Sequence, residues 1–369
     1  MANIFDYLKW RGDLTFTQDP VNAVDALIFS ALVYIHYSGT VEETPVTLRE
    51  AAEEFFSQDD LEDSFRVKND LELLRVAADT VRFGLAKICM YRDQLIPELE
   101  TQFAALTFLL DDGTMFLAFR GTDSTLTGWK EDFNMSFQQI VPSQRMAVEY
   151  VRDVEAAYML PMRLGGHSKG GNLAVFAAAR SLPARQKRIL EVYNNDGPGF
   201  TDYMMGDPGY LAMVPRIRTF IPQSSVIGML LEHEEPYTVV RSKNVGILQH
   251  DPYSWEVMGN GLVTMQEVTY SSQFMDATIK AWFAEMTDQE RGQLVDEMFS
   301  LLGTGDVNKA ADIFHPKNLR IYLKTLSGDE NLRRILSTEF QGLIEAVKKT
   351  HIQLESGKEA QNLLEEGNR

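Results

Sequence analysis

Apolar side chains in the first hundred residues recur at helical spacing. One apolar face, with intervals of three and four residues, is formed by Leu27, Ile28, Ala31, Leu32 and Ile35. The segment 71–88 has the same period, and the acidic, amphipathic segment 41–65 is typical of solvated helix and loop. The pattern therefore predicts a mostly helical region over residues 1–100.

Short apolar runs replace this pattern after residue 100. Two of them, 104–110 and 114–120, flank the turn sequence Asp111-Asp112-Gly113 and predict a β-hairpin. The elements predicted after the hairpin are a helix near 142–159, a strand at 162–166, a helix at 170–182, and strands at 188–195, 216–222 and 236–242. Because strands alternate with helices, this part of the chain predicts an α/β sandwich.

Beyond about residue 275, apolar residues recur only at helical spacing. Helices are predicted at 279–302, 306–315 and 330–354, with turn sequences between them. We therefore predict three parts: an α/β domain over 1–275 with a helical N-terminal region, a helical C-terminal extension over 276–355, and a polar tail over 356–369.

The acidic composition narrows the classes of function. The 369 residues include 35 Lys and Arg against 53 Asp and Glu, a formal net charge of −18. We expect no nucleic-acid partner, because nucleic acids also carry negative charge. No apolar run approaches the roughly 20 residues of a membrane span, so we expect no stable membrane insertion. The single cysteine, Cys89, and the lack of a secretory-signal pattern at the N-terminus lead us to expect a cytoplasmic protein.

A serine lies between glycines at the junction of a predicted strand and a predicted helix. The segment reads Gly166-His167-Ser168-Lys169-Gly170, which is the pattern G-x-S-x-G. Glycines at these two positions permit a tight turn that exposes the serine oxygen, and the N-terminus of the following helix presents N–H groups to an oxyanion. A phosphate-binding Walker loop is excluded, because Gly171 stands where its lysine should be. The pattern predicts that Ser168 is a nucleophile.

A general base for this serine should follow the later strands of the sheet. The sequence has six histidines: His36, His167, His233, His250, His315 and His351. His250 lies in a turn-rich loop after the strand predicted at 236–242, which is the position expected of the base. His233, in the acidic stretch LLEHEEPY, stays open as a second candidate.

The acid that orients the base is expected at the end of a strand. Asp196 follows the strand predicted at 188–195 and precedes Gly197-Pro198-Gly199. The end of the next strand carries no carboxylate, so Asp196 is the predicted acid. Asp251, adjacent to His250, is the alternative.

Two backbone groups are candidates for binding the oxyanion. The strand predicted at 114–120 leads into Gly121-Thr122, so Thr122 could offer its N–H and its hydroxyl. Lys169, directly after the predicted nucleophile, would offer its N–H. Chemistry of this kind needs neither a cofactor nor a metal ion.

These segments resemble the class 3, fungal-type lipases. The run from Phe119 to Ser124, with Trp129 and Asp132, is similar to their F-R-G-[ST]…W…D pattern, and GHSKGGNLA resembles their GHSLGGALA. The segments at the N-terminus, YNNDGPGF and QHDPYSWEV resemble the bacterial Mbeg1-like family over roughly 1–260. The resemblance implies an α/β-hydrolase fold with a mixed sheet and flanking helices. It also implies an oxyanion role for Thr122 and catalytic roles for Ser168 and His250.

The sequence departs from the lipase pattern at two places. The segment Phe220–Val226, where such lipases carry the acid, has none, and Lys169 replaces a leucine. Lys169 is interpreted as a solvent-facing residue at the start of a helix, with a role in attracting anionic substrates as the alternative.

We therefore predict an esterase- or lipase-like serine hydrolase that cleaves a small-molecule or lipid ester, or a thioester, through an acyl-enzyme. The alternative is a weak or inactive hydrolase fold that serves as an interaction protein.

Overall fold

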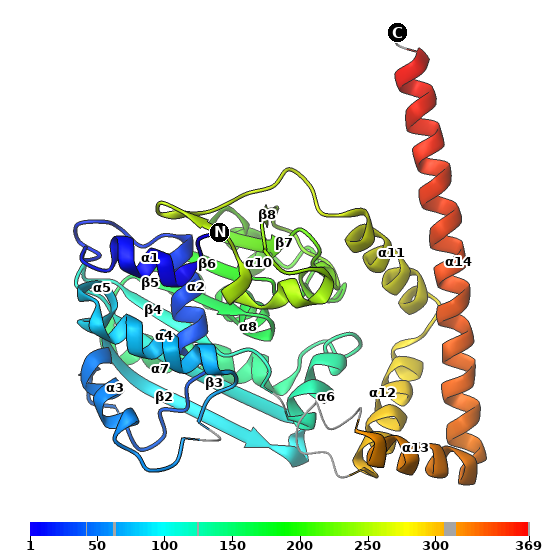
Figure 1. The fold of residues 1–369 in the computed structure, drawn as a ribbon, viewed down its shortest axis with the longest axis horizontal. Coiled ribbons are helices and arrows are strands. Elements are labelled where there is room, and N and C mark those ends of the chain that lie inside the picture. Colours follow the sequence, from blue (N-terminus) through cyan, green and yellow to red (C-terminus); the bar gives the residue numbers. More distant parts are fainter. Residues whose placement is uncertain (42, 62–63, 124, 306–314, 368–369) are drawn as a thin grey trace.

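A mixed eight-stranded sheet forms the centre of the molecule (Figure 1). The computed structural model describes residues 1–41, 43–61, 64–123, 125–305 and 315–367. In spatial order, which is also chain order, the strands are β1 (Val46–Thr47), β2 (Lys87–Ile96), β3 (Thr101–Leu109), β4 (Met115–Phe119), β5 (Met162–His167), β6 (Ile189–Asn195), β7 (Ile217–Pro222) and β8 (Tyr237–Val240). Strands β1 to β4 pair antiparallel and β4 to β8 pair parallel. The predicted α/β architecture and the predicted hairpin are confirmed.

Alternation along the central strands divides the core into two layers. Phe116 and Ala118 of β4 face one layer, and Met115, Leu117 and Phe119 face the other. Successive side chains of a strand point to opposite faces, so a strand that is apolar throughout must be covered on both sides. All five of these residues are buried.

Helices from the N-terminal region cover one face of the sheet. They are α1 (Ile4–Arg11), α2 (Ala23–Leu32), α3 (Leu48–Phe56), α4 (Lys68–Asp79) and α5 (Val81–Gly84). Asn22 caps α2 by accepting from the N–H groups of Val24 and Asp25. Asp25 also binds the buried guanidinium of Arg82 at 2.6 Å, which ties α2 to α5.

Two strands in this region were not predicted, the two-residue β1 and the longer β2. Residues 87–96 form β2, although the sequence indicated helix through most of the first hundred residues. The pairing of β2 with β3 shifts between Cys89 and Arg92, and Met90 between them has a φ of 54°. Such a bulge breaks the period of two that identifies a strand, so the pattern of 87–96 does not reveal it.

The other face of the sheet is covered by helices from the middle of the chain. They are α7 (Pro142–Tyr158), α8 (Lys169–Ala179) and α10 (Pro208–Met213), with the short α9 (Pro183–Gln186) nearby in sequence. Every residue of α8 is buried, and its glycines and alanines allow close packing on β5 and β6. The helices predicted at 142–159 and 170–182 are therefore confirmed.

The C-terminal helices lie beside this body (Figure 1). They are α11 (Tyr270–Ala284), α12 (Asp288–Gly303), α13 (Pro316–Gly328) and α14 (Glu330–Gly367). The helix predicted at 279–302 is divided, because Thr287 and Glu290 form a capping box that starts α12. The helix predicted at 306–315 falls almost wholly on residues 306–314, which lie outside the described part of the chain. Helix α14 continues through the predicted polar tail to Gly367.

Helix α12 packs against α6 (Leu126–Asn134), which follows the turn after β4. The rings of Phe133 and Phe299 meet edge to face with centroids 5.8 Å apart, and Lys130 Nζ lies 2.8 Å from an Asp296 oxygen. A two-stranded ribbon, β9 (Val257–Met258) and β10 (Gly261–Leu262), lies between β8 and α11 in the chain. Among the helices described, none has the length and apolar character needed to cross a membrane.

Candidate active site

Ser168 occupies a strained turn between β5 and α8. Its φ of 59° and ψ of −135° are unusual for a residue with a side chain. A Cβ at Gly166 would lie 2.2 Å from the carbonyl carbon of Gly170, and a Cβ at Gly170 would lie 2.1 Å from the carbonyl oxygen of Phe119. The two glycines of the G-x-S-x-G pattern are therefore required by close backbone contact, as expected for a nucleophile turn.

Asp196 and His250, two of the predicted site residues, are in direct contact. His250 Nδ1 donates to Asp196 Oδ2 at 2.7 Å. Asp196 follows β6, has a φ of 55° and is completely buried, whereas the His250 side chain is 26% exposed. A buried carboxylate that holds Nδ1–H of a partly exposed imidazole leaves Nε2 available as a base. The alternative acid, Asp251, instead accepts from the N–H of Tyr253 at 3.1 Å.

Two further donors hold the Asp196 carboxylate. Its Oδ1 accepts from Ser225 Oγ at 2.5 Å and from the Gly228 N–H at 3.1 Å. Both donors come from the loop after β7, the segment in which the lipase-like pattern lacks its acid. The loop does not carry the predicted acid. It supplies two hydrogen-bond donors to Asp196 instead.

His167, the residue before Ser168, supports the loop that carries His250. Its Nε2–H donates to the carbonyl oxygen of His250 at 2.7 Å, and its Nδ1 accepts from Tyr34 Oη at 3.1 Å. The two imidazole rings lie with centroids 4.5 Å apart. Burial lowers the pKa of His167 well below its ordinary value, so the ring is neutral and this tautomer is fixed.

His167 thus places His250 beside the nucleophile turn, a role that the sequence did not indicate. No hydrogen bond between Ser168 Oγ and His250 occurs among the described residues, and such bonds are often long without substrate.

The turn that contains Thr122 packs directly on the nucleophile turn. A Cβ at Gly121 would lie 2.5 Å from the carbonyl oxygen of His167 and 3.0 Å from Ser168 Cβ. Thr122 Oγ1 donates to both carboxylate oxygens of Asp132, at 2.7 and 2.6 Å. Burial raises the pKa of Asp132 to about 6. Above this pH the ionised carboxylate of Asp132 holds the hydroxyl hydrogen of Thr122.

The interpretation of Lys169 as a solvent-facing residue was wrong. Its side chain is 1% exposed, and Nζ lies 2.8 Å from Glu131 Oε2 and 3.1 Å from the carbonyl oxygen of Gln102. The ammonium group is therefore neutralised within the protein by α6. The partner is 38 residues away in the chain, so no local pattern in the sequence indicates the pair.

Replacing Lys169 with methionine is expected to lower the free energy of unfolding by about 3–5 kcal/mol, because the buried Glu131 carboxylate would lose the ammonium group that pairs with its charge. The double variant Lys169→Met/Glu131→Gln should recover most of this loss. Urea unfolding of the wild type, the single variant and the double variant measures both values, and equal losses in the two variants would contradict the pairing.

The same pair has a defined pH dependence. Burial alone would raise the pKa of Glu131, but the Lys169 ammonium lowers this pKa below its ordinary value. The contribution of the pair to stability is therefore present above the ordinary carboxyl pKa and is lost as the pH falls through the lowered one.

The mixed sheet with helices on both faces is the α/β-hydrolase-like fold that was predicted. The chain belongs to the Mbeg1-like family, whose model matches residues 77–300. A sequence comparison with curated proteins finds no match.

Solved structures with a similar fold include several lipases. The Rhizomucor miehei lipase propeptide complex is 15% identical, with a TM-score of 0.36, over 58% of this chain and 67% of that chain. A Penicillium cyclopium protein described as MDLA is 12% identical, with a TM-score of 0.38, over 67% of this chain and 87% of its own. A triacylglycerol lipase from Penicillium expansum is 12% identical, with a TM-score of 0.29, over 49% of this chain and 74% of its own.

Proposed function

We propose that the protein is a serine hydrolase that cleaves a carboxylic ester or thioester through an acyl-enzyme. The observation that supports this most is the 2.7 Å hydrogen bond from His250 Nδ1 to the buried Asp196, beside a serine held in a strained turn. An interaction protein would gain nothing from the backbone strain at Ser168 or from the buried carboxylate at Asp196.

The proposed reaction begins when Ser168 Oγ attacks the acyl carbon and His250 Nε2 takes the proton. Asp196 stabilises the imidazolium that forms, and the N–H groups of Thr122 and Lys169 bind the oxyanion. The first N–H groups of α8 suit this role, because a helix N-terminus leaves them without intrahelical acceptors. The alcohol or thiol leaves with the proton from His250. Water activated by the same base then releases the acid.

Exposed aliphatic side chains next to His250 favour a substrate with an acyl chain. Val245, Ile247 and Leu248 are 75%, 62% and 64% exposed on the turn that leads into His250. Gln249 fixes this turn, donating to the Asn244 carbonyl at 2.8 Å and accepting from the Ser224 N–H at 2.7 Å. Three apolar side chains held outward at the edge of the site provide a surface for hydrocarbon.

A fluorophosphonate probe tests the proposal. We expect stoichiometric labelling of the folded protein, with mass spectrometry placing the label on Ser168, and no labelling after heat denaturation. A panel of p-nitrophenyl esters should then give a kcat/KM that rises from acetyl to medium-length acyl chains. A folded protein that is neither labelled nor active on any ester would contradict the proposal and favour the interaction protein.

A further inference from the structure

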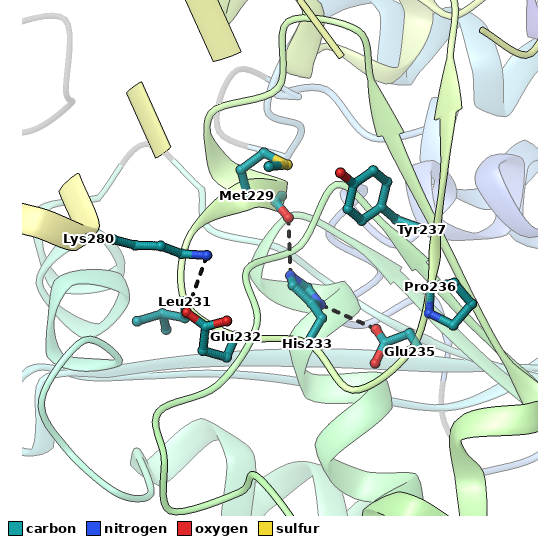
Figure 2. Close-up of a pocket in the computed structure, with 9 residues that line it drawn as sticks. Met229, Leu231, Glu232, His233, Glu235, Pro236, Tyr237 and Lys280 are labelled. Atoms are coloured by element: carbon teal, nitrogen blue, oxygen red, sulfur yellow. Dashed lines mark hydrogen bonds and ion pairs between the residues drawn. The ribbon is translucent and has the colours of Figure 1, made fainter. Parts of the chain in front are cut away.

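Gly228 connects the predicted acid to a second histidine. Its N–H donates to Asp196 Oδ1 at 3.1 Å, and its carbonyl oxygen accepts from His233 Nε2 at 3.1 Å. Figure 2 shows His233 between this carbonyl and Glu235. His233 therefore holds the same residue that donates to Asp196, through the carbonyl on the other side of its Cα.

Glu235 anchors His233 to the body of the fold. His233 Nδ1 lies 3.3 Å from Glu235 Oε1, and the Glu235 side chain is fully buried. The carboxylate also accepts from Thr219 Oγ1 of β7 at 2.6 Å and from Tyr210 Oη of α10 at 2.5 Å. Burial acts to raise the pKa of Glu235, but the hydrogen bond from His233 helps to lower it below its ordinary value. Glu235 is therefore ionised.

Both partners of the His233 ring accept hydrogen bonds. A carbonyl oxygen has no hydrogen to give, and an ionised carboxylate accepts only. Nε2 of the ring therefore donates to the Gly228 carbonyl, and Nδ1 faces the Glu235 carboxylate. His233 and Glu235 thus form a second histidine–carboxylate pair. This pair binds the Gly228 carbonyl instead of a substrate.

We propose that His233 and Glu235 are positioning residues: they hold Gly228 in place through its carbonyl oxygen, so that its N–H keeps Asp196 in the orientation that His250 requires. This inference rests on the proposed hydrolase function. It also gives a role to His233, which the sequence offered only as an alternative base. The ring is bound at both nitrogens, so neither is free to act as a base.

The other charged groups around His233 pair with one another. Lys280 Nζ lies 3.2 Å from Glu232 Oε1 and 3.4 Å from Asp276 Oδ1. Together with apolar residues, Glu232 and Lys280 line a cavity of about 350 Å³ next to His233 (Figure 2). The cavity leaves room for substitutions at His233, and Glu232 provides a control position on the same pocket.

Two substitutions at His233 separate its two hydrogen bonds. The side-chain amide of His233→Gln reaches about as far as Nε2 and retains a donor to the Gly228 carbonyl. The shorter amide of His233→Asn reaches only as far as Nδ1 and retains the contact with Glu235. We expect kcat on an ester substrate to fall about tenfold in His233→Asn with KM unchanged, and by less than about threefold in His233→Gln. Glu235→Gln should resemble His233→Asn, and Glu232→Gln should match the wild type.

Thermal unfolding establishes that each variant is folded. If His233→Asn does not fold, Glu235→Gln takes its place in the comparison. Equal kcat in the Asn and Gln variants, or a loss confined to KM, would overturn the inference. The low-field proton resonance of His250 Nδ1–H offers a readout without turnover. It should broaden in His233→Asn and persist in His233→Gln. A wild-type protein that shows this resonance but no labelling by fluorophosphonate would contradict the hydrolase function and leave the positioning role supported.

Discussion

Replacing Ser168 with alanine is expected to lower kcat for ester hydrolysis about 10⁶-fold, because no other group can form the acyl-enzyme. The proposed oxyanion donors, the N–H groups of Thr122 and Lys169, remain in this variant. A residual rate of about 10³–10⁴ over the reaction in water should therefore persist. Steady-state and single-turnover kinetics with a p-nitrophenyl ester measure both values.

Ser225 supplies the matched control for this experiment. Its hydroxyl is also near the site but donates to Asp196, so Ser225→Ala should lose far less kcat and should keep full labelling by fluorophosphonate. Hydrolysis by Ser168→Ala at the rate of the wild type would remove Ser168 from the mechanism.

Replacing Asp196 with asparagine is expected to lower kcat about 10⁴-fold. The amide would turn an N–H toward His250 Nδ1, which favours the tautomer that has its proton on Nε2 and cannot act as a base. Asparagine tolerates a φ of 55° about as well as aspartate, so the backbone should keep its conformation. The loss should appear in kcat with little change in KM or in thermal stability.

Asp251→Asn is the control for the acid. Asp251 caps the turn that begins at Pro252, and asparagine caps as well as aspartate, so this variant should retain kcat within about twofold. The reverse result, with Asp251→Asn inactive and Asp196→Asn active, would exchange the assignments of the two carboxylates.

The hydrophobic pattern was sufficient to predict most of the central sheet. The hairpin of β3 and β4, the strands from β5 to β8 and the helices α7 and α8 are regular, and period and turn residues identify regular elements. The bulge at Met90 removes that regularity from β2. In the C-terminal region, apolar residues keep their helical spacing across the boundary between α11 and α12. The pattern therefore does not reveal the new helix start at Thr287, because a capping box needs only two polar residues.

The candidate site was predictable where chemistry is placed at the ends of strands. Asp196 and His250 were both predicted from position, and they are in contact. The support around them was not predictable, because His167, Ser225 and Gly228 act through contacts that connect distant loops. Lys169 shows the same limit, since only the fold brings Glu131 to it.

The order of the strands in the sheet equals their order along the chain. During synthesis, each strand can therefore pair with the one that left the ribosome before it, with no need to wait for a distant partner. The turn that carries Ser168 can therefore form at the growing edge before Asp196 and His250 have emerged from the ribosome. The protein acquires its proposed catalytic groups one after another, and only when the loop after β8 emerges can the nascent chain become reactive.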